Sequence, residues 1–448
     1  MRSPSASPAE ARSAKAFRWL LRKEWRELTR ARAWWAMLAL VGPLVGVSFI
    51  NAVRTYGEAS AGAATGGGEA FSPLDGVWSP TFSAYELIAI FLLPFVAIRL
   101  MTADRQSGAL KLELQRPISP FARVGAKAIV LLGGWIAAGA AAIAAGVLWA
   151  SYGGHTYAPE LAAVVLGHLL NAALTIGLAA AAATVTEHPS TAAIATLGVT
   201  IGTWAVSFIA AVQGGVWETI AGYTPMAMVS MFQHGLVRAD VVLIALALAA
   251  TGFGVAGIWI EIGKSIQTRL VRTAALAGTA ALAVTIASFV RPSWDLSENR
   301  RNSFSESDEA ALRHLPGRLQ MEVHLAQRDP RRFDLEVHAL AKLRRVRPDV
   351  EVTYIARTSI GLFEQADPGY GEIRYNMNGR QAVSRVTTAE GVLETIYDLA
   401  GVTVPADNEA PYKGYPLTAR PTGAPLIFYV LWPVLTAALG IAINRRTR

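Results

Sequence analysis

Glycine, lysine and serine residues that could hold a nucleotide phosphate occur at Gly257 and Gly263-Lys264-Ser265. A phosphate loop has four residues between its glycines and lies between a strand and a helix. Here five residues separate the glycines, and the stretch ends an apolar segment. The sequence therefore predicts no ATP-binding site, and we expect no cofactor on this chain.

Other catalytic patterns are also missing from the sequence. The chain has no cysteine, no Gly-x-Ser-x-Gly elbow and no His-Glu-x-x-His motif. Thiolate catalysis needs a cysteine, the serine nucleophile of α/β-hydrolases lies in the Gly-x-Ser-x-Gly elbow, and zinc proteases of the His-Glu-x-x-His type need that motif. We therefore expect no catalytic residue and no metal site. A membrane enzyme remains the least favoured class of function, and detectable turnover by the isolated chain would revive it.

Two polar residues lie within apolar segments, Glu86 and His168. A polar group inside a membrane is costly and invites a functional interpretation, such as a proton or metal role. The alternatives stay open: Glu86 would reach external headgroups, and His168 would hydrogen-bond a neighbouring helix.

Eight apolar segments could position these groups, because a membrane span needs roughly 20 mostly apolar residues. They lie near residues 34–53, 82–101, 128–150, 161–186, 191–213, 239–260, 273–290 and 425–443. The predicted fold is therefore a mainly α-helical polytopic membrane protein. Residues 33–265 form a six-span core, 273–290 and 425–443 are the seventh and eighth spans, and 292–421 form a polar domain between them.

Charge distribution predicts the orientation of the spans. Residues 292–421 hold 17 basic and 19 acidic residues, against 41 and 33 in the whole chain, which leaves 24 basic and 14 acidic residues elsewhere. The basic excess therefore belongs to the membrane part, where the balance is +10. Nucleic acid is not needed to explain it. Lys and Arg gather before the first span, after the second, after the sixth and at the end of the chain. By the positive-inside rule both termini are cytoplasmic and residues 292–421 are external, which implies the cytoplasmic (inner) membrane.

Residues 15–32 are typical of an amphipathic helix in the membrane interface, after a polar tail at 1–14 that we expect to be disordered. Apolar residues recur at helical spacing among basic ones. The residues assigned to this elbow helix are Phe17, Leu21, Glu24 and Trp25. The alternative is a basic tail that only directs topology.

The polar domain at 292–421 is predicted to be a small α/β module. Ser305 and Asp308 predict a helix to Leu315, followed by a strand at 319–325, a helix at 333–346 and a strand at 350–354. Asn378-Gly379 predicts a hairpin, and Thr387 with Glu390 predicts the cap of a last helix. This order of elements is that of a thioredoxin-like module, and without cysteine it cannot be a redox one.

Apolar residues stand inside a charged loop after the second span. They are Leu110, Leu112 and Leu114, and Pro117 and Pro120 end the stretch. Apolar residues in such a loop predict a docking surface for a cytoplasmic partner. A merely structured loop is the alternative.

The same loop resembles that of type-2 ABC exporter permeases. Asp104-Arg105, Gly108, Leu110 to Leu114, Pro117 and Lys127 stand at the positions of that family's pattern. The resemblance implies an ATPase-docking role for Asp104, Arg105 and Gly108. It also implies that residues 15–32 are the elbow helix, that a separate cytoplasmic subunit binds ATP, and that two such chains pair as a homodimer.

The stretch from Trp294 to Ser305 resembles the opening of the auxiliary domain of gliding-motility-type ABC transporters. That resemblance implies a permease fused to a shortened auxiliary domain, with an extracytoplasmic protein as a further partner. The expected function is the membrane subunit of an ABC exporter. The alternative is an assembly factor that passes ATPase motion to an envelope partner without moving a solute.

Overall fold

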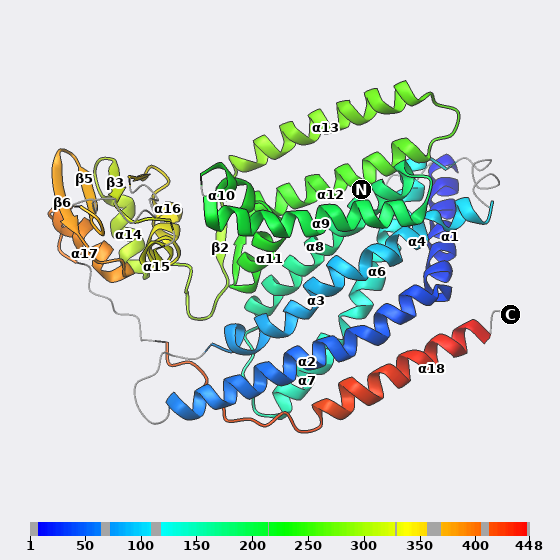
Figure 1. Cartoon of the computed structure of the whole chain (residues 1–448), viewed down its shortest axis with the longest axis horizontal. Coiled ribbons are helices and arrows are strands. Elements are labelled where there is room, and N and C mark those ends of the chain that lie inside the picture. The colour runs from blue at the N-terminus through cyan, green and yellow to red at the C-terminus, as the bar shows by residue number, and fades with distance from the viewer. Residues whose placement is uncertain are drawn as a thin grey trace, which may run out of the picture. The chain divides into compact units, whose positions relative to one another are not determined.

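The computed structural model describes residues 8–63, 72–108, 118–213, 215–327, 329–355, 369–404 and 412–445 (Figure 1). Two compact units divide the chain. The membrane unit contains residues 1–204, 223–294 and 413–448, and the second unit contains residues 205–222 and 295–412.

Eight helical spans long and apolar enough to cross a membrane are present in the described residues, and the prediction of a mainly helical, eight-span fold is confirmed. Several spans consist of two helices in direct succession. The elements are α2 (Arg32–Ala63), η1 (Leu74–Trp78) with α3 (Ser79–Phe91) and α4 (Leu93–Gln106), α6 (Pro120–Ala138) with α7 (Ala140–Ser151), α8 (Ala158–Val185), α9 (Pro189–Gln213), α12 (Ala239–Ile260), α13 (Ile266–Ser288), and η3 (Leu426–Leu431) with α18 (Trp432–Arg445). Between α9 and α12 lie α10 (Val216–Ala221), α11 (Pro225–Gln233) and the short strand β1 (Leu236–Arg238), and β2 (Ser293–Asp295) follows α13.

The first helix, α1 (Pro8–Arg30), is longer than the predicted 15–32 segment. Residues 8–14, which we expected in a disordered tail, form its first turns. Pro8 stands at the start of the helix, where a missing N–H costs nothing, and good helix formers follow it. The helix ends at Arg30, and α2 begins at Arg32.

A side chain interrupts the third span between α6 and α7. The Tyr85 hydroxyl of α3 donates to the Ala138 carbonyl at 3.0 Å and accepts from the Ala142 N–H at 3.1 Å. The hydroxyl thus bridges the Ala138 carbonyl and the Ala142 N–H, four residues apart, so both groups have a partner at the break between the two helices. Trp135 packs edge-on against the Tyr85 ring.

The last span packs against the first, and the two lie side by side in Figure 1. Gly42 and Gly46 of α2 face Trp432 and Phe428, and a Cβ added at these glycines would lie 2.1 and 2.4 Å from those side chains. The Trp432 indole N–H also donates to the Leu38 carbonyl at 2.7 Å. Small residues thus allow a close helix contact that carries its own hydrogen bond.

Gly42→Leu should therefore push α18 away from α2 and destabilise the membrane unit by about 1–3 kcal/mol, the usual cost of overpacking. The measurement is the thermal midpoint of the purified protein in detergent. Gly62→Leu is the matched control in the same helix, since a Cβ there meets nothing within 4 Å. Equal midpoints for the two variants would contradict the close contact.

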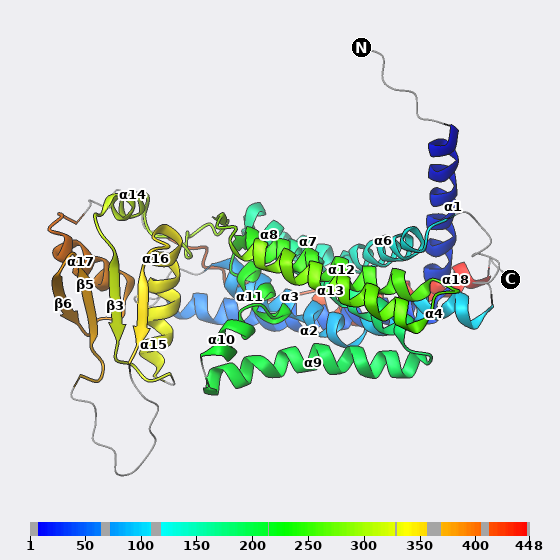
Figure 2. The ribbon, with the colours of Figure 1, turned by 90° about the horizontal axis from the view of Figure 1, so that it is seen from above.

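The second unit contains a four-stranded sheet with the order β4-β3-β5-β6. Figure 2 labels three neighbouring strands of this sheet, β6, β5 and β3. Its strands are β3 (Leu319–Val323), β4 (Glu351–Tyr354), β5 (Ile373–Met377) and β6 (Arg380–Ser384). Strands β3 and β4 are parallel, with Met321 opposite Val352, and the other neighbours are antiparallel. Alternate residues of β3 and β5 are buried against the helices. These helices are α14 (Glu306–His314), α15 (Pro330–Asp334), η2 (Leu335–Leu340), α16 (Ala341–Val346) and α17 (Ala389–Ala400).

The turn and helix-cap residues of this unit are those predicted from the sequence, except for one cap. Asn378 and Gly379 have φ of 52° and 78°, as a type I′ hairpin requires, and the Ser305 hydroxyl caps α14 by accepting from the Asp308 N–H. The last helix is capped by Thr388, not Thr387: the Thr388 hydroxyl accepts from the Gly391 N–H. The cap falls one residue later because Thr388 is the residue with extended backbone directly before the first helical turn.

The stretch that begins at Asp295 is organised by that carboxylate. It accepts hydrogen bonds from the Ser297 N–H at 3.1 Å, the Asn302 N–H at 2.9 Å and the Ser303 hydroxyl at 2.8 Å. Burial acts to raise the pKa of Asp295, but hydrogen bonds from the side chains of Ser297, Asn302 and Ser303 and from the Ser297 N–H outweigh it and hold the pKa below its ordinary value. The sequence pattern from Trp294 to Ser305 therefore has a structural role, the closure of this turn.

Candidate functional site

The two intramembrane polar residues singled out in the sequence meet through a third residue. The Gln233 amide of α11 donates to Glu86 of α3 at 2.6 Å and lies 3.4 Å from His168 Nε2 of α8. The His168 side chain is buried and its Nδ1 has no hydrogen-bond partner among the described residues. Sequence reasoning treated Glu86 and His168 separately and did not find Gln233, which lies in a short helix outside the eight spans.

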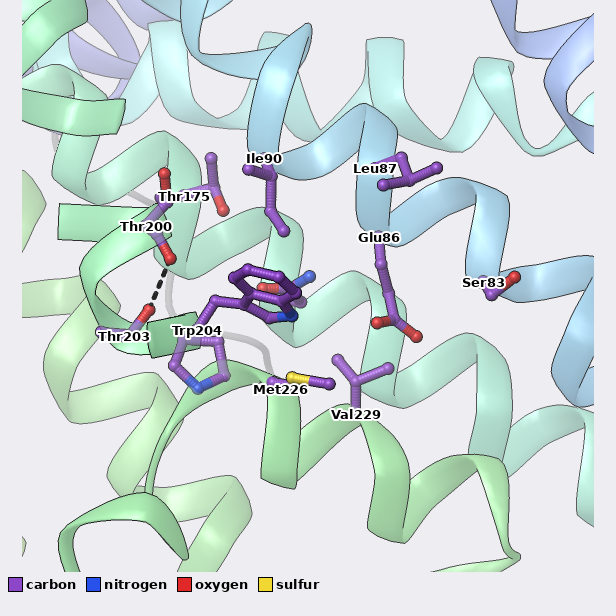
Figure 3. A pocket seen from close by; sticks show the side chains of 12 residues that line it. Ser83, Glu86, Leu87, Ile90, Thr175, Thr200, Thr203, Trp204, Met226 and Val229 are labelled. Carbon is purple, nitrogen blue, oxygen red and sulfur yellow. Dashed lines mark hydrogen bonds between the residues drawn. The ribbon is translucent and has the colours of Figure 1, made fainter. Parts of the chain in front are cut away.

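Beside Glu86 lies a cavity of about 280 Å³ between α3, α8, α9 and α11 (Figure 3). Its polar lining residues are Ser83, Glu86, Asn171, Thr175, Thr200 and Thr203. Trp204 projects into the same space, with Met226 and Val229 below it in the view. The membrane unit thus gathers more polar groups at one place than its sequence suggests.

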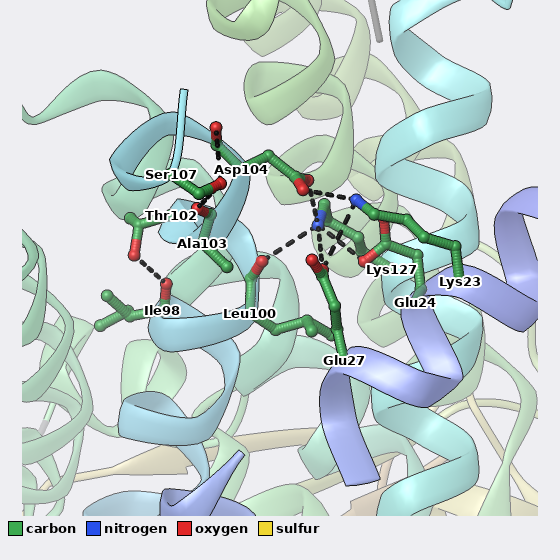
Figure 4. Close-up of polar contacts among 10 residues, drawn as sticks. All are labelled: Lys23, Glu24, Glu27, Ile98, Leu100, Thr102, Ala103, Asp104, Ser107 and Lys127. Atoms are coloured by element: carbon green, nitrogen blue, oxygen red, sulfur yellow. Dashed lines mark hydrogen bonds and ion pairs between the residues drawn. The ribbon is translucent and has the colours of Figure 1, made fainter. Parts of the chain in front are cut away.

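A second polar site joins three helices by five charged side chains, which we call the charge cluster (Figure 4). It consists of Lys23, Glu24 and Glu27 from α1, Asp104 from the end of α4, and Lys127 from the first turns of α6. Lys127 Nζ lies 2.7 Å from Glu24 Oε2 and 2.7 Å from Asp104 Oδ2, and it donates to the Leu100 carbonyl at 3.0 Å. Lys23 pairs with Asp104 from the other side.

Helical spacing on α1 explains why these groups face inward. Leu20, Glu24 and Leu28 recur every four residues, and all three are buried. The two leucines pack in the apolar interior while Glu24 stands between them and meets Lys127. Burial of Glu24, Asp104 and Lys127 is nearly complete, at 0, 2 and 2% exposed. Charges this deep are stable only when paired, so the cluster holds α1, α4 and α6 in fixed relation.

Three carboxylates face two ammonium groups, and the excess charge falls on Glu27. Its Oε2 lies 3.5 Å from Lys23 Nζ and 3.8 Å from Lys127 Nζ, too far for good hydrogen bonds. Burial raises the pKa of Glu27 to about 7, with Asp104 and Glu24 adding to the rise and the lysines opposing it. The cluster therefore loses a proton in the physiological pH range.

Glu27 should make the stability of the membrane unit pH-dependent. Because its folded pKa of about 7 lies above the ordinary value of 4.5, the stabilising effect is complete below about 4.5 and is lost as pH rises through 7. We expect the thermal midpoint to fall between pH 6 and pH 8, and Glu27→Gln to remove this dependence while retaining side-chain shape. A midpoint that falls equally in the variant would assign the pH effect to another group.

Carboxylate oxygens of Glu24, Glu27 and Asp104 lie within 4.8 Å of one another, the spacing of a metal site. In this arrangement, however, the ammonium group of Lys127 lies against two of the three carboxylates. The lysines thus occupy the place that a cation would take, and the geometry is that of an ion-pair network.

The residues of the predicted docking loop differ in their exposure to solvent. Asp104 is buried in the charge cluster and does not face outward, whereas Arg105 and Gly108 are exposed. The Arg105 guanidinium donates to the carbonyls of Thr186 at 2.9 Å and Thr184 at 3.2 Å, at the end of α8. Gly108 has φ of 75°, which favours glycine. Leu110, Leu112 and Leu114 lie outside the described residues.

The residues assigned to the elbow helix also differ in burial. Glu24 is buried in the cluster, Phe17 and Leu21 are half-buried, and Trp25 is exposed beside Gly133 of α6. Sequence reasoning did not connect Glu24 with Lys127. The available signal was Lys127 itself, since a lysine inside an apolar segment needs a partner.

Comparison with known proteins gives one family. No curated protein and no solved structure matches the chain, so the thioredoxin-like and gliding-motility-type resemblances stay predictions. Residues 18–233 match the model of the ABC-2 family transporter proteins, and this stretch runs from α1 through the first five spans to Gln233 of α11. It includes the whole charge cluster and the Glu86–Gln233–His168 group. Over residues 18–233, this multi-pass membrane chain is therefore similar to the ABC-2 family transporter proteins.

Proposed function

We propose that the chain is the membrane subunit of an ABC-type export system driven by a separate cytoplasmic ATPase. The charge cluster is the observation that carries this proposal. It ties the helix before the first span to the end of the second span and the start of the third, the two spans that residues 107–119 connect along the chain. A force applied to that loop would reach three helices at once.

In this mechanism, one set of residues binds the ATPase and another residue transmits its movement to the helices. Arg105, Gly108 and the leucines of the loop would contact the ATPase, since Arg105 and Gly108 are exposed. Asp104 would pass the movement inward, because its carboxylate pairs with Lys23 and Lys127. Helix α1 then moves with α4 and α6, and the cavity beside Glu86 changes shape because α3 and α4 form one span.

The proposal also covers the membrane in which the chain lies and the number of chains that assemble. Lys and Arg in the short loops support cytoplasmic termini in the inner membrane, with the second unit outside. We also propose that two chains pair, because one six-span region supplies half of a pathway of the type-2 exporter kind. ATP is bound by the partner subunit, and the lipid bilayer surrounds the spans.

A second candidate function is an assembly factor that transmits force to an extracytoplasmic partner. It is favoured by the contacts inside the second unit. Gln327 donates to the Ala210 carbonyl of α9 at 2.8 Å and to Glu218 of α10 at 3.2 Å, and Arg332 lies 3.6 Å from Glu218. The α/β module is therefore attached to the end of a span, and a shift of that end would move it.

Affinity purification of the tagged chain in mild detergent tests the first proposal. We expect an ATP-hydrolysing subunit to elute with the chain, and Arg105→Glu to reduce the amount bound. Arg272→Glu is the control, since Arg272 is also exposed and pairs with a carboxylate, Glu261. A chain that elutes without any ATPase, from cells in which it functions, would contradict the proposal.

A further inference from the structure

A large apolar groove lies between α3, the α6–α7 span and α8. Its volume is about 730 Å³, within the range of small-molecule sites. Its apolar walls are formed mainly by Trp78, Phe82, Trp135, Ile143, Val147 and Val165. All three bordering elements are membrane spans, and Ile143, Val147 and Val165 are exposed in the structure. The groove therefore opens to hydrocarbon, and its occupant must have an apolar chain.

The groove has a polar end. His168 lines it together with Tyr85, and the buried His168 Nδ1 has no hydrogen-bond partner among the described residues. An orphaned polar atom of this kind is costly and is satisfied when a ligand brings a polar group to it. A purely apolar occupant would leave it unsatisfied, so the structure favours an amphiphile.

The charge of the amphiphile follows from the neighbouring cavity. Glu86 lines the 280 Å³ cavity, and no basic residue is among the residues that line it. Gln233 connects a residue that lines each space, because its amide donates to Glu86 at 2.6 Å and lies 3.4 Å from His168 Nε2. An ammonium group would make the same hydrogen bond with a full charge, which is stronger than that of a neutral amide. Trp204 on the cavity wall offers an aromatic surface to the same cation (Figure 3).

We propose that these two spaces form one binding site for a cationic amphiphile, with its alkyl chain in the groove and its ammonium group on Glu86. The amide of Gln233 gives way to the ammonium group, and the polar end of the groove guides that group past His168. The inference deepens the proposed function, because it names the substrate class of the permease region.

Equilibrium binding of radiolabelled dodecylammonium to the full chain in nanodiscs tests the proposal, with empty nanodiscs subtracted. We expect saturable binding that unlabelled dodecylammonium displaces and that dodecanol displaces at least about ten-fold less well, since a hydrogen bond to a charged group is lost. Glu86→Gln should weaken binding by a similar factor while retaining the contact with Gln233.

A second pair of variants tests the groove. Ala142 lines it, so Ala142→Phe should abolish saturable binding, whereas Ala275→Phe on the exposed face of α13 should bind as the unmodified chain does. Binding that is absent in the unmodified chain, equal in Ala142→Phe, or displaced equally by dodecanol would overturn the proposal. The assay contains no ATPase, so its failure is separate from a failure of the co-purification experiment.

Discussion

Lys127→Met is expected to destabilise the membrane unit by about 3–5 kcal/mol, more than the overpacking variant Gly42→Leu. Lys127 is 2% exposed and pairs with Glu24 and Asp104, both also buried. Removing the ammonium group leaves two carboxylates side by side without their main counter-charge. Methionine retains most of the side-chain length, so the loss reports charge and not volume. The measurement is the thermal midpoint and the yield of folded protein in detergent.

Two further variants make this prediction specific to the cluster. Lys264→Met applies the same substitution to an exposed lysine and should leave the midpoint unchanged. The triple variant Glu24→Gln, Asp104→Asn, Lys127→Met replaces the buried charges by neutral groups of similar shape and should regain most of the lost stability, as replacement of whole buried ion pairs often does. If Lys127→Met and Lys264→Met behaved alike, the cluster would not hold the three helices together.

Asp104→Asn should separate transmission from docking. The substitution retains the side-chain shape but removes the charge that pairs with Lys23 and Lys127. We expect the ATPase subunit to bind in the same amount, because Asp104 is buried, while ATP hydrolysis by the complex falls at least about five-fold, within the usual range of coupling energies. Both quantities are measured on one affinity-purified preparation.

Asp240→Asn is the matched control, since Asp240 is also buried and paired with an arginine, Arg238, but lies at the start of α12 away from the cluster. It should change neither quantity. Loss of the bound ATPase subunit in Asp104→Asn would instead mean that Asp104 contributes to docking.

The membrane spans were predictable because length and hydropathy alone determine them. Helix α12, at Ala239–Ile260, coincides with the span predicted at 239–260. The hairpin at Asn378-Gly379 was predictable because few other residues adopt the positive φ angles that its turn requires. Both signals are local in sequence. The start of α1 at Pro8 was missed because its polar first turns lack the apolar periodicity used to find helices.

The charge cluster was not predictable in the same way. Its members come from three helices, and in sequence each has an ordinary explanation: Lys23 and Glu27 as surface charges, Asp104 as part of a loop. Only the fold shows that Glu24 turns inward to Lys127. The break at Gly139 is similar, because the hydroxyl that supports it belongs to Tyr85 in another span.

The movement of α1 and α4 as one body is the central claim, and distances between spin labels test it most directly. The chain has no cysteine, so Arg22→Cys and Gln106→Cys can be labelled as a pair and Arg22→Cys can be paired with Ala275→Cys on α13. All three sites are exposed. The complex with its ATPase is placed in nanodiscs and labelled chains are diluted with unlabelled ones. On addition of ATP the Arg22–Gln106 distance should stay constant while the Arg22–Ala275 distance changes. A change in the first distance, or no response of either, would contradict the account.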